Sequence, residues 1–224
     1  MNHFHFVADY NDWVRHLIGT NDRKTAMSLA VGGNWDEIGK KLTKLAQDLG
    51  LKSGMNVLDF ACGSGRFAHY LSKDLDIPQY VGIDVVQELL DYAGEVCPDH
   101  YEFTLNRSLS LPVEDNAFDY AFGFSIFTHL LQTEIKIYSD EVNRSLKPGG
   151  MFVYSFLEMH LHSKTLETSA AAHLAYGKPY PHLNIFLSRD QVTFLAEMTG
   201  FEVVKFVEPT EAIGQSVVVL KKLG

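Results

Sequence analysis

Apolar residues recur along the chain with two alternating spacings, one typical of helices and one of strands. Between Trp35 and Leu49 they fall at every third or fourth position, which predicts an amphipathic helix. Shorter apolar runs follow, each separated from the next by another helical pattern or a turn. We predict strands at 56–60, 80–83, 101–105, 118–124 and 151–157, and helices at 35–49, 66–73, 86–93 and 135–146.

The C-terminal part adds one more helix and two more strands. Ser188 and Gln191 have the spacing of a capping box, and Gly200 ends the helix that they open. The strands expected at 201–207 and 215–221 are joined too closely for a crossover helix, so they should pair antiparallel. We predict an α/β fold: a doubly wound, mostly parallel, seven-stranded sheet with its last strand antiparallel and helices on both faces.

The 224 residues contain no internal repeat and no segment with the composition of a linker, so we interpret 1–224 as a single domain. The pattern divides it into an N-terminal arm or lid at 1–34, a cofactor-binding core at 35–157, a lid or substrate insertion at 158–187 and a C-terminal helix and strand pair at 188–224.

Composition excludes several classes of protein. Lys and Arg number 19 and Asp and Glu 28, so the formal charge of −9 repels nucleic acid, which we do not expect as a partner. No apolar run reaches the roughly 18 to 20 residues of a membrane helix, so we expect no membrane association. Two cysteines and the absence of a basic-then-apolar N-terminus predict a cytoplasmic location. The composition leaves the oligomeric state open.

The segment 57–70, VLDFACGSGRFAHY, runs from a strand through a glycine turn into a helix. Gly63-x-Gly65-x-x-Ala68 fits the dinucleotide fingerprint, so a nicotinamide-dependent oxidoreductase is one alternative. Asp59 lies at the carboxyl end of the strand, where it would repel a pyrophosphate and attract a cation. S-adenosylmethionine has a sulfonium, an ammonium and no phosphate, so it fits this acid.

A second acid, Asp84, directly follows the strand YVGI and comes 21 residues after Gly63. At that place a carboxylate can accept hydrogen bonds from both ribose hydroxyls of a nucleoside cofactor. Because nicotinamide and S-adenosylmethionine sites share this feature, Asp84 alone does not discriminate between them.

At this point the chain resembles the class I (Rossmann-like) S-adenosylmethionine-dependent methyltransferases of the small-molecule type. Four blocks carry the resemblance in the family's order: VLDFACGSG at 57–65, VGIDVV at 81–86, LPVEDNAFDYAFGFSIFTHL at 111–130 and EVNRSLKPGGMFVYSF at 141–156. The resemblance implies one methyltransferase domain with S-adenosyl-L-methionine as cofactor and S-adenosyl-L-homocysteine as product.

The resemblance also implies which residues bind the cofactor. Asp59, Ala61, Gly63 and Gly65 would hold its methionine end, Asp84 and Val85 its ribose and adenine, while Phe124 and Ser125 would lie beside it. Where family members often have Gly-Asp near the adenine amino group, this chain has Asn106-Arg107, and an arginine cannot accept from an amino group. We therefore include Asn106, Arg107 and Ser108 as candidate cofactor-binding residues near the adenine. The contact with the adenine amino group itself is expected from Asn106, from Ser108 or from backbone.

Candidate catalytic residues follow the fourth and fifth strands. Methyl transfer depends mainly on alignment, so a general base is optional. His129 is the first candidate; the alternative is that Thr128 and His129 cap the next helix and pack under a loop. Glu158 and His160 are expected near the same end of the sheet. His160 alternates with His162 as a metal pair would, but no third ligand is evident, and we expect no metal.

About 30 residues between the fifth strand and Ser188 are too many for a plain connection. Their aromatic content favours an ordered lid, and aromatic residues of the N-terminal arm would add a second wall or would simply pack helices onto the sheet. The arm residues are Phe4, Phe6, Tyr10 and Trp13. We predict S-adenosylmethionine-dependent methyl transfer to an oxygen or nitrogen of a small molecule; a non-catalytic module that binds this cofactor is a second alternative.

Overall fold

The computed structural model describes residues 4–224, so the first three residues of the predicted N-terminal arm lie outside the described residues. The helices are α1 His5–Thr20, α2 Arg23–Ala30, α3 Trp35–Asp48, α4 Arg66–Asp74, α5 Gln87–Val96, α6 Gln132–Ser145, α7 Ser163–Tyr176 and α8 Arg189–Met198, with a short 3-10 turn, η1, at Met159–Leu161. The strands are β1 Val57–Phe60, β2 Tyr80–Asp84, β3 Glu102–Leu105, β4 Phe118–Gly123, β5 Leu146–Glu158, β6 Phe186–Leu187, β7 Phe201–Val207 and β8 Ser216–Lys222.

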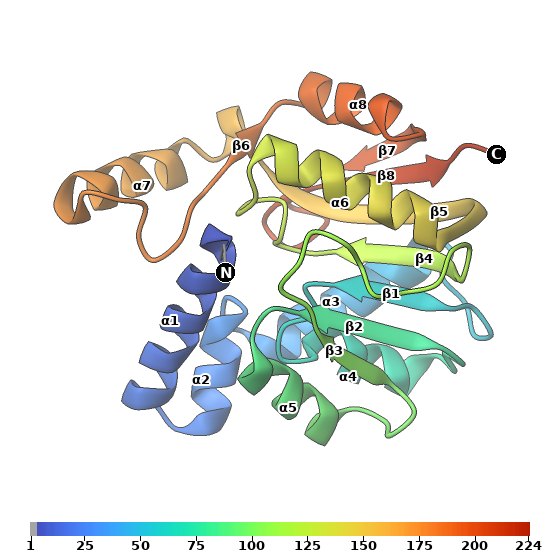
Figure 1. The fold of residues 1–224 in the computed structure, drawn as a ribbon, viewed down its shortest axis with the longest axis horizontal. Coiled ribbons are helices and arrows are strands. Elements are labelled where there is room, and N and C mark those ends of the chain that lie inside the picture. The colour runs from blue at the N-terminus through green and yellow to red at the C-terminus, as the bar shows by residue number, and fades with distance from the viewer. Residues whose placement is uncertain (1–3) are drawn as a thin grey trace.

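The strands form one mixed sheet in the order β3-β2-β1-β4-β5-β8-β7 (Figure 1). The first five strands in this order pair in parallel, while β8 is antiparallel to both β5 and β7. The predicted fold class and the antiparallel pairing at the end of the chain are therefore confirmed. The two-residue strand β6, which pairs with the end of β5, adds an eighth strand that the sequence pattern did not predict.

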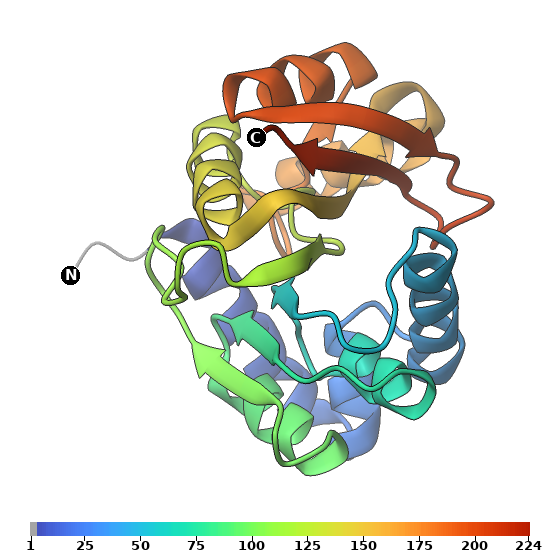
Figure 2. The ribbon, with the colours of Figure 1, turned by 90° about the vertical axis from the view of Figure 1, so that its right-hand side faces the viewer.

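Both faces of the sheet are buried, as expected for a parallel sheet. Leu58 and Phe60 of β1 belong to a cluster that includes residues of α6 and α8, whereas Val57 packs with α3 and α4. This alternation follows from the two-residue period of a strand. Figure 2 shows helices on either side of the sheet.

The N-terminal part contains two helices for which the sequence pattern predicted only an arm. Asp22 caps α2 by accepting a hydrogen bond from the Thr25 amide. The indole of Trp35 donates to Ser64 Oγ at 2.9 Å, and the guanidinium of Arg66 donates to the Gly33 carbonyl at 3.0 Å. The Ser64 hydroxyl also donates to the Met27 carbonyl of α2 at 3.1 Å, so the glycine turn is attached to α2 and to the start of α3.

The segment after β5 contains α7, which projects from the body of the molecule (Figure 1). Within the described residues, α7 has no buried side chain, in contrast to the helices that flank the sheet. Both cysteines are buried and free. Across residues 4–224 we find no helix with the length and apolarity needed to cross a membrane.

Candidate functional site

A cavity of about 610 Å³ lies where β1, β2 and β4 end, and α1, α2 and the segment after β5 cover it. Carboxyl ends of strands are the usual ligand site of doubly wound sheets. The expected residues that line it are Asp59, Ala61, Gly63, Asp84, Val85, Asn106, Phe124, Ser125 and His129. The expected residues outside its lining are Gly65, Arg107, Ser108, Glu158 and His160.

The glycine turn has the backbone shape that its sequence suggests. Ala61, Gly63 and Gly65 all have positive φ values of 57° to 75°, which is unusual for the alanine. A Cβ atom on Gly65 would meet the Cβ of Ala93 at 2.8 Å. Gly65 therefore allows α4 to begin close against α5, while Gly63 lines the cavity.

Asp84, at the end of β2, accepts three backbone hydrogen bonds. The Gly63 amide donates to one carboxylate oxygen at 2.9 Å, and the amides of Val85 and Val86 donate to the other at 2.7 and 3.0 Å. Burial raises the pKa of Asp84, and the three amides oppose this rise. The carboxylate thus joins β2 to the glycine turn in the wall of the cavity.

Asp59, at the end of β1, is 3% exposed and lines the same cavity. The Tyr80 hydroxyl donates to Oδ2 at 2.5 Å, but no described residue donates to Oδ1. Burial raises the pKa of Asp59 to about 7, and the nearby charge of Asp84 adds to this rise. Two buried carboxylates with one nearby guanidinium, that of Arg66, form a region that favours a cationic ligand.

On the adenine side, the side chains expected to reach the cofactor bind protein groups instead. Asn106 donates to the Ser110 carbonyl at 2.8 Å and accepts from the Ser108 hydroxyl at 2.8 Å. Arg107 donates to the Val85 carbonyl at 3.0 Å and to Asn11. Of the three candidates only Asn106 lines the cavity.

The end of β4 is held in an unusual backbone conformation. Ser125 has a φ of 60°, and its amide donates to Ser155 Oγ at 2.7 Å. Ser155 in turn donates to Gln215 Oε1 at 2.6 Å. Strained residues of this kind concentrate at functional sites, and both Ser125 and Gln215 line the cavity.

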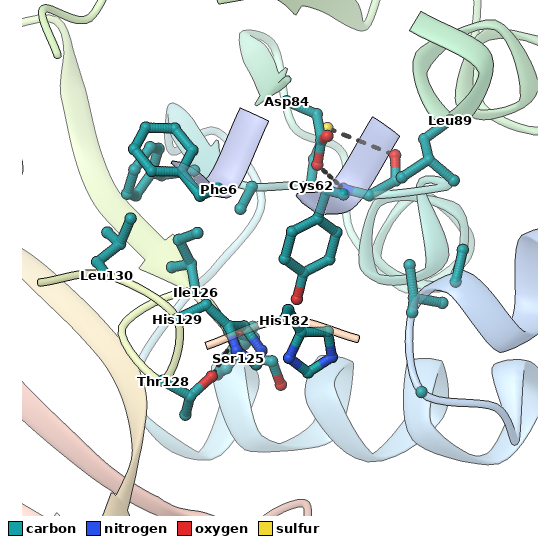
Figure 3. A pocket seen from close by; sticks show the side chains of 18 of the residues that line it. Phe6, Cys62, Asp84, Leu89, Ser125, Ile126, Thr128, His129, Leu130 and His182 are labelled. Carbon is teal, nitrogen blue, oxygen red and sulfur yellow. Dashed lines mark hydrogen bonds between the residues drawn. The ribbon is translucent and has the colours of Figure 1, made fainter. Parts of the chain in front are cut away.

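Three aromatic side chains from distant parts of the chain meet opposite Asp84. The ring centroids of His129 and His182 are 4.3 Å apart, and Tyr10 of α1 stacks on His182 at 5.4 Å. Figure 3 shows the two histidines on one side of the cavity and Asp84 on the other. We define Tyr10, His129 and His182 as the aromatic cluster.

The hydrogen bond of His129 determines which nitrogen is available. Its Nδ1 lies 2.7 Å from the Leu183 carbonyl, so this nitrogen carries the proton, and no described residue binds Nε2. Burial and the adjacent His182 lower the pKa of His129 to about 3, so the ring is neutral near pH 7. The Nδ1 of His182 is also buried and has no hydrogen-bond partner within residues 4–224.

Glu158 and His160, the other two candidate catalytic residues, do not line the cavity. The Glu158 carboxylate accepts from Arg189 Nε at 3.0 Å and from the Ser216 hydroxyl at 2.8 Å, which joins β5 to α8 and β8. The side chain of His160 is 71% exposed. His162 lines the cavity and lies within hydrogen-bond distance of the Glu158 and Gly214 carbonyls.

Sequence reasoning did not single out His182 and Gln215 as site residues. His182 follows a Pro-rich turn and Gln215 begins the expected last strand, so no local motif distinguishes either one. The N-terminal lining residues Phe6, Tyr10 and Trp13 were expected as a second wall, and all three line the cavity. In the described part of the chain, no three His, Cys, Asp or Glu side chains are grouped to hold a metal ion.

The sheet order, the glycine turn and the two acids at the ends of β1 and β2 define a nucleoside-cofactor site of the Rossmann-like class. Residues 57–150 match the family model described as "Methyltransferase domain". A curated relative, demethylmenaquinone methyltransferase from Staphylococcus aureus, is 32% identical over 114 residues, which cover 49% of this chain and 46% of that protein. The chain thus spans about half the length of the curated relatives it matches.

Solved structures share the fold across almost the whole chain. One is the methyltransferase in a Haloferax volcanii complex with the Trm112 methyltransferase activator, with a TM-score of 0.71, 15% identity and 97% of each chain covered. Another is the magnesium protoporphyrin IX methyltransferase of Synechocystis with bound S-adenosylhomocysteine, with a TM-score of 0.66, 14% identity and 97% of each chain covered. The match at 57–150 and the shared fold thus support the resemblance of this chain to the class I S-adenosylmethionine-dependent methyltransferases.

Proposed function

We propose that the protein transfers the methyl group of S-adenosylmethionine to an oxygen or nitrogen atom of a small molecule. The observation that carries this proposal is the cavity itself, which has two buried carboxylates on one side and a neutral histidine with a free nitrogen on the other. Its volume is within the range of small-molecule sites, about 300 to 1,000 Å³.

The residues present fit the cofactor. Asp59 Oδ1 is an acceptor without a described protein donor, and a buried carboxylate in this state is stabilised by a cation such as the cofactor's ammonium. Asp84 is placed to accept from ribose hydroxyls, and Val85 and Leu89 line the same part of the cavity. When bound, S-adenosylmethionine supplies an electrophilic methyl group on a sulfonium.

We assign His129 the task of orienting the acceptor. Because Nδ1 is fixed by the Leu183 carbonyl, Nε2 can accept a hydrogen bond from the acceptor's O–H or N–H group. A pKa of about 3 makes His129 a weak proton acceptor, so its contribution is alignment more than full proton removal. His182 offers a second ring nitrogen beside it.

Two neighbouring proteins support a small acceptor. The names of the Staphylococcus aureus relative and the Synechocystis structure refer to demethylmenaquinone and magnesium protoporphyrin IX, which are small molecules. The formal charge of −9 also disfavours nucleic acid as the acceptor. A cytoplasmic location remains a prediction from the sequence.

Calorimetric titration with S-adenosylmethionine, S-adenosylhomocysteine and NAD tests the cofactor. We expect heat with the first two ligands and none with NAD; the reverse result would support the oxidoreductase alternative. Methyl transfer from labelled S-adenosylmethionine to a panel of hydroxyl and amine metabolites then tests catalysis. Tight binding of the cofactor with no transfer to any panel member would favour the non-catalytic module.

A further inference from the structure

A second hollow, of about 500 Å³, lies between α7 and the segment that returns from it to β6. On the helix, Leu166, Ala170 and Leu174 line it, four residues apart, so they share one face of α7. On the returning segment Tyr180, Leu183 and Phe186 line it. None of the described residues that line this hollow is Asp, Glu, Lys or Arg. We call it the α7 groove.

The apolar side chains of the α7 groove are not covered by the rest of the described chain. Leu174 is 88% exposed and Leu166 is 41% exposed, although both are large and apolar. The groove is nevertheless held in shape, because Asn184 Nδ2 donates to Ser169 Oγ at 2.9 Å and ties the returning segment to the helix. An ordered, uncovered apolar hollow is typical of a binding surface.

The α7 groove adjoins the cofactor cavity. His182 and Asn184 line both hollows, and Thr165 and Leu166, adjacent on α7, line one hollow each. His182 is also the residue whose ring lies 4.3 Å from His129. A ligand with its polar group at His129 would therefore reach the groove by passing His182 and Asn184, the two residues that line both hollows.

We infer that the α7 groove binds an apolar chain of the methyl acceptor, so that the substrate class is a polar head with a hydrocarbon tail. This inference rests on the proposed function for the location of the head, and on the groove itself for the tail. The lack of charged lining residues favours a hydrocarbon over a peptide or a charged partner. Burial of a hydrocarbon chain here would also cover Leu166 and Leu174.

The test uses 4-alkylphenols with ethyl, butyl and hexyl chains, titrated calorimetrically into the protein saturated with S-adenosylhomocysteine. The groove variant is the double substitution Leu166→Gln with Leu174→Gln. Both side chains are exposed and glutamine is a good helix former, so the variant should fold. The matched control is Phe194→Gln with Met198→Gln, two exposed apolar residues four positions apart on α8.

We expect the affinity of the wild type and of the control to rise about threefold or more for each added methylene, or roughly hundredfold from ethyl to hexyl. In the groove variant we expect a rise of about tenfold or less. An equal rise in all three proteins, or no rise in the wild type, would overturn the inference. The inference would also be overturned if sedimentation showed that the wild type self-associates and the groove variant does not, and if the affinity for the alkylphenols did not change with chain length.

Failure of the proposed function gives a different result. If the proposed function is wrong, the wild type does not bind S-adenosylhomocysteine. If only the inference about the groove is wrong, the affinities of the wild type, the groove variant and the control for S-adenosylhomocysteine agree within about twofold. If the cofactor product does not bind, the alkylphenol series is run without it. The difference between the groove variant and the control then decides the inference by the same criterion.

Discussion

The strands β1 and β2, which end at the cavity, and the helix α7, which projects beyond it, differ in how deeply they are buried. Every residue of β1 and β2 is buried, whereas no residue of α7 is, within the described chain. Burial on both faces fixes the ends of these strands, and with them Asp59 and Asp84. Helix α7 has no such constraint, so we expect its sequence to tolerate substitution better than the strands do.

The two regions also differ in charge. The cofactor side has two buried carboxylates, each with a raised pKa. The covering side has the aromatic cluster, in which burial lowers the pKa of both His129 and His182 and keeps them neutral. Under the proposed function, these two walls would match a cationic cofactor on one side and an uncharged acceptor group on the other.

The first prediction contrasts burial in the two regions. Leu58→Ala removes a fully buried side chain of β1 and should lower the free energy of unfolding by about 2 to 5 kcal/mol. Leu174→Ala on α7 should change it by less than about 0.5 kcal/mol. Urea unfolding followed by circular dichroism measures both values. A loss at Leu174 as large as that at Leu58 would mean that α7 is packed in solution.

The second prediction concerns the acceptor side. With an acceptor identified from the panel, His129→Gln should lower turnover about hundredfold, because the hydrogen bond that orients the nucleophile is lost. Affinity for S-adenosylhomocysteine should stay within about twofold. His160→Gln, at an exposed side chain outside the cavity, is the control and should leave turnover unchanged. Equal losses in the two variants would contradict the role of His129.

The third prediction concerns the cofactor side. Asp84→Ala should weaken S-adenosylhomocysteine binding about 10- to 100-fold, since it removes charged hydrogen bonds to the ribose and the acceptor of the Gly63 amide. Asp91→Ala, at an exposed position of α5, is the control and should have no effect. Calorimetry measures both affinities. A loss of less than about threefold at Asp84 would remove it from the cofactor site.

The fourth and smallest effect is a pH dependence that arises from Asp59. With a pKa of about 7 in the folded protein, Asp59 is mostly protonated at pH 6, and a cationic ligand binds its ionised form better. Affinity for S-adenosylhomocysteine, which carries an ammonium group, should therefore rise about eightfold from pH 6 to pH 7.5 and then level off. In Asp59→Asn the profile should be flat; an unchanged slope would assign the titration to another group.

Asp59 also predicts how the free energy of unfolding of the ligand-free protein changes with pH. Between about pH 4 and pH 7 the folded chain holds a proton on Asp59 that the unfolded chain has released. The contribution of this proton to the free energy of unfolding is thus complete below pH 4 and is lost as the pH rises towards 7. Melting curves of the wild type and Asp59→Asn across this range compare the two directly.

The central elements were predictable because their signals are local. The apolar runs at 56–60 and 80–83 predict β1 and β2 within one residue at each end, and the patterns at 35–49 and 66–73 do the same for α3 and α4. The glycine turn, Asp59 and Asp84 follow directly from the ends of those strands. The two N-terminal helices were missed because α1 begins without a side-chain cap, and part of their stability comes from packing on α5 and from the hydrogen bond of Ser64 to the Met27 carbonyl.

The sequence alone thus determined the sheet, the glycine turn and the two acids of the cofactor side, since parallel strands bring their carboxyl ends to one edge. Only the tertiary structure brought Tyr10, His129 and His182 together, from three segments up to 172 positions apart. It also paired Glu158 with Arg189 and left it outside the cavity. Such contacts depend on how covering helices lie against the sheet, and that is decided by packing between distant side chains, which no local pattern records.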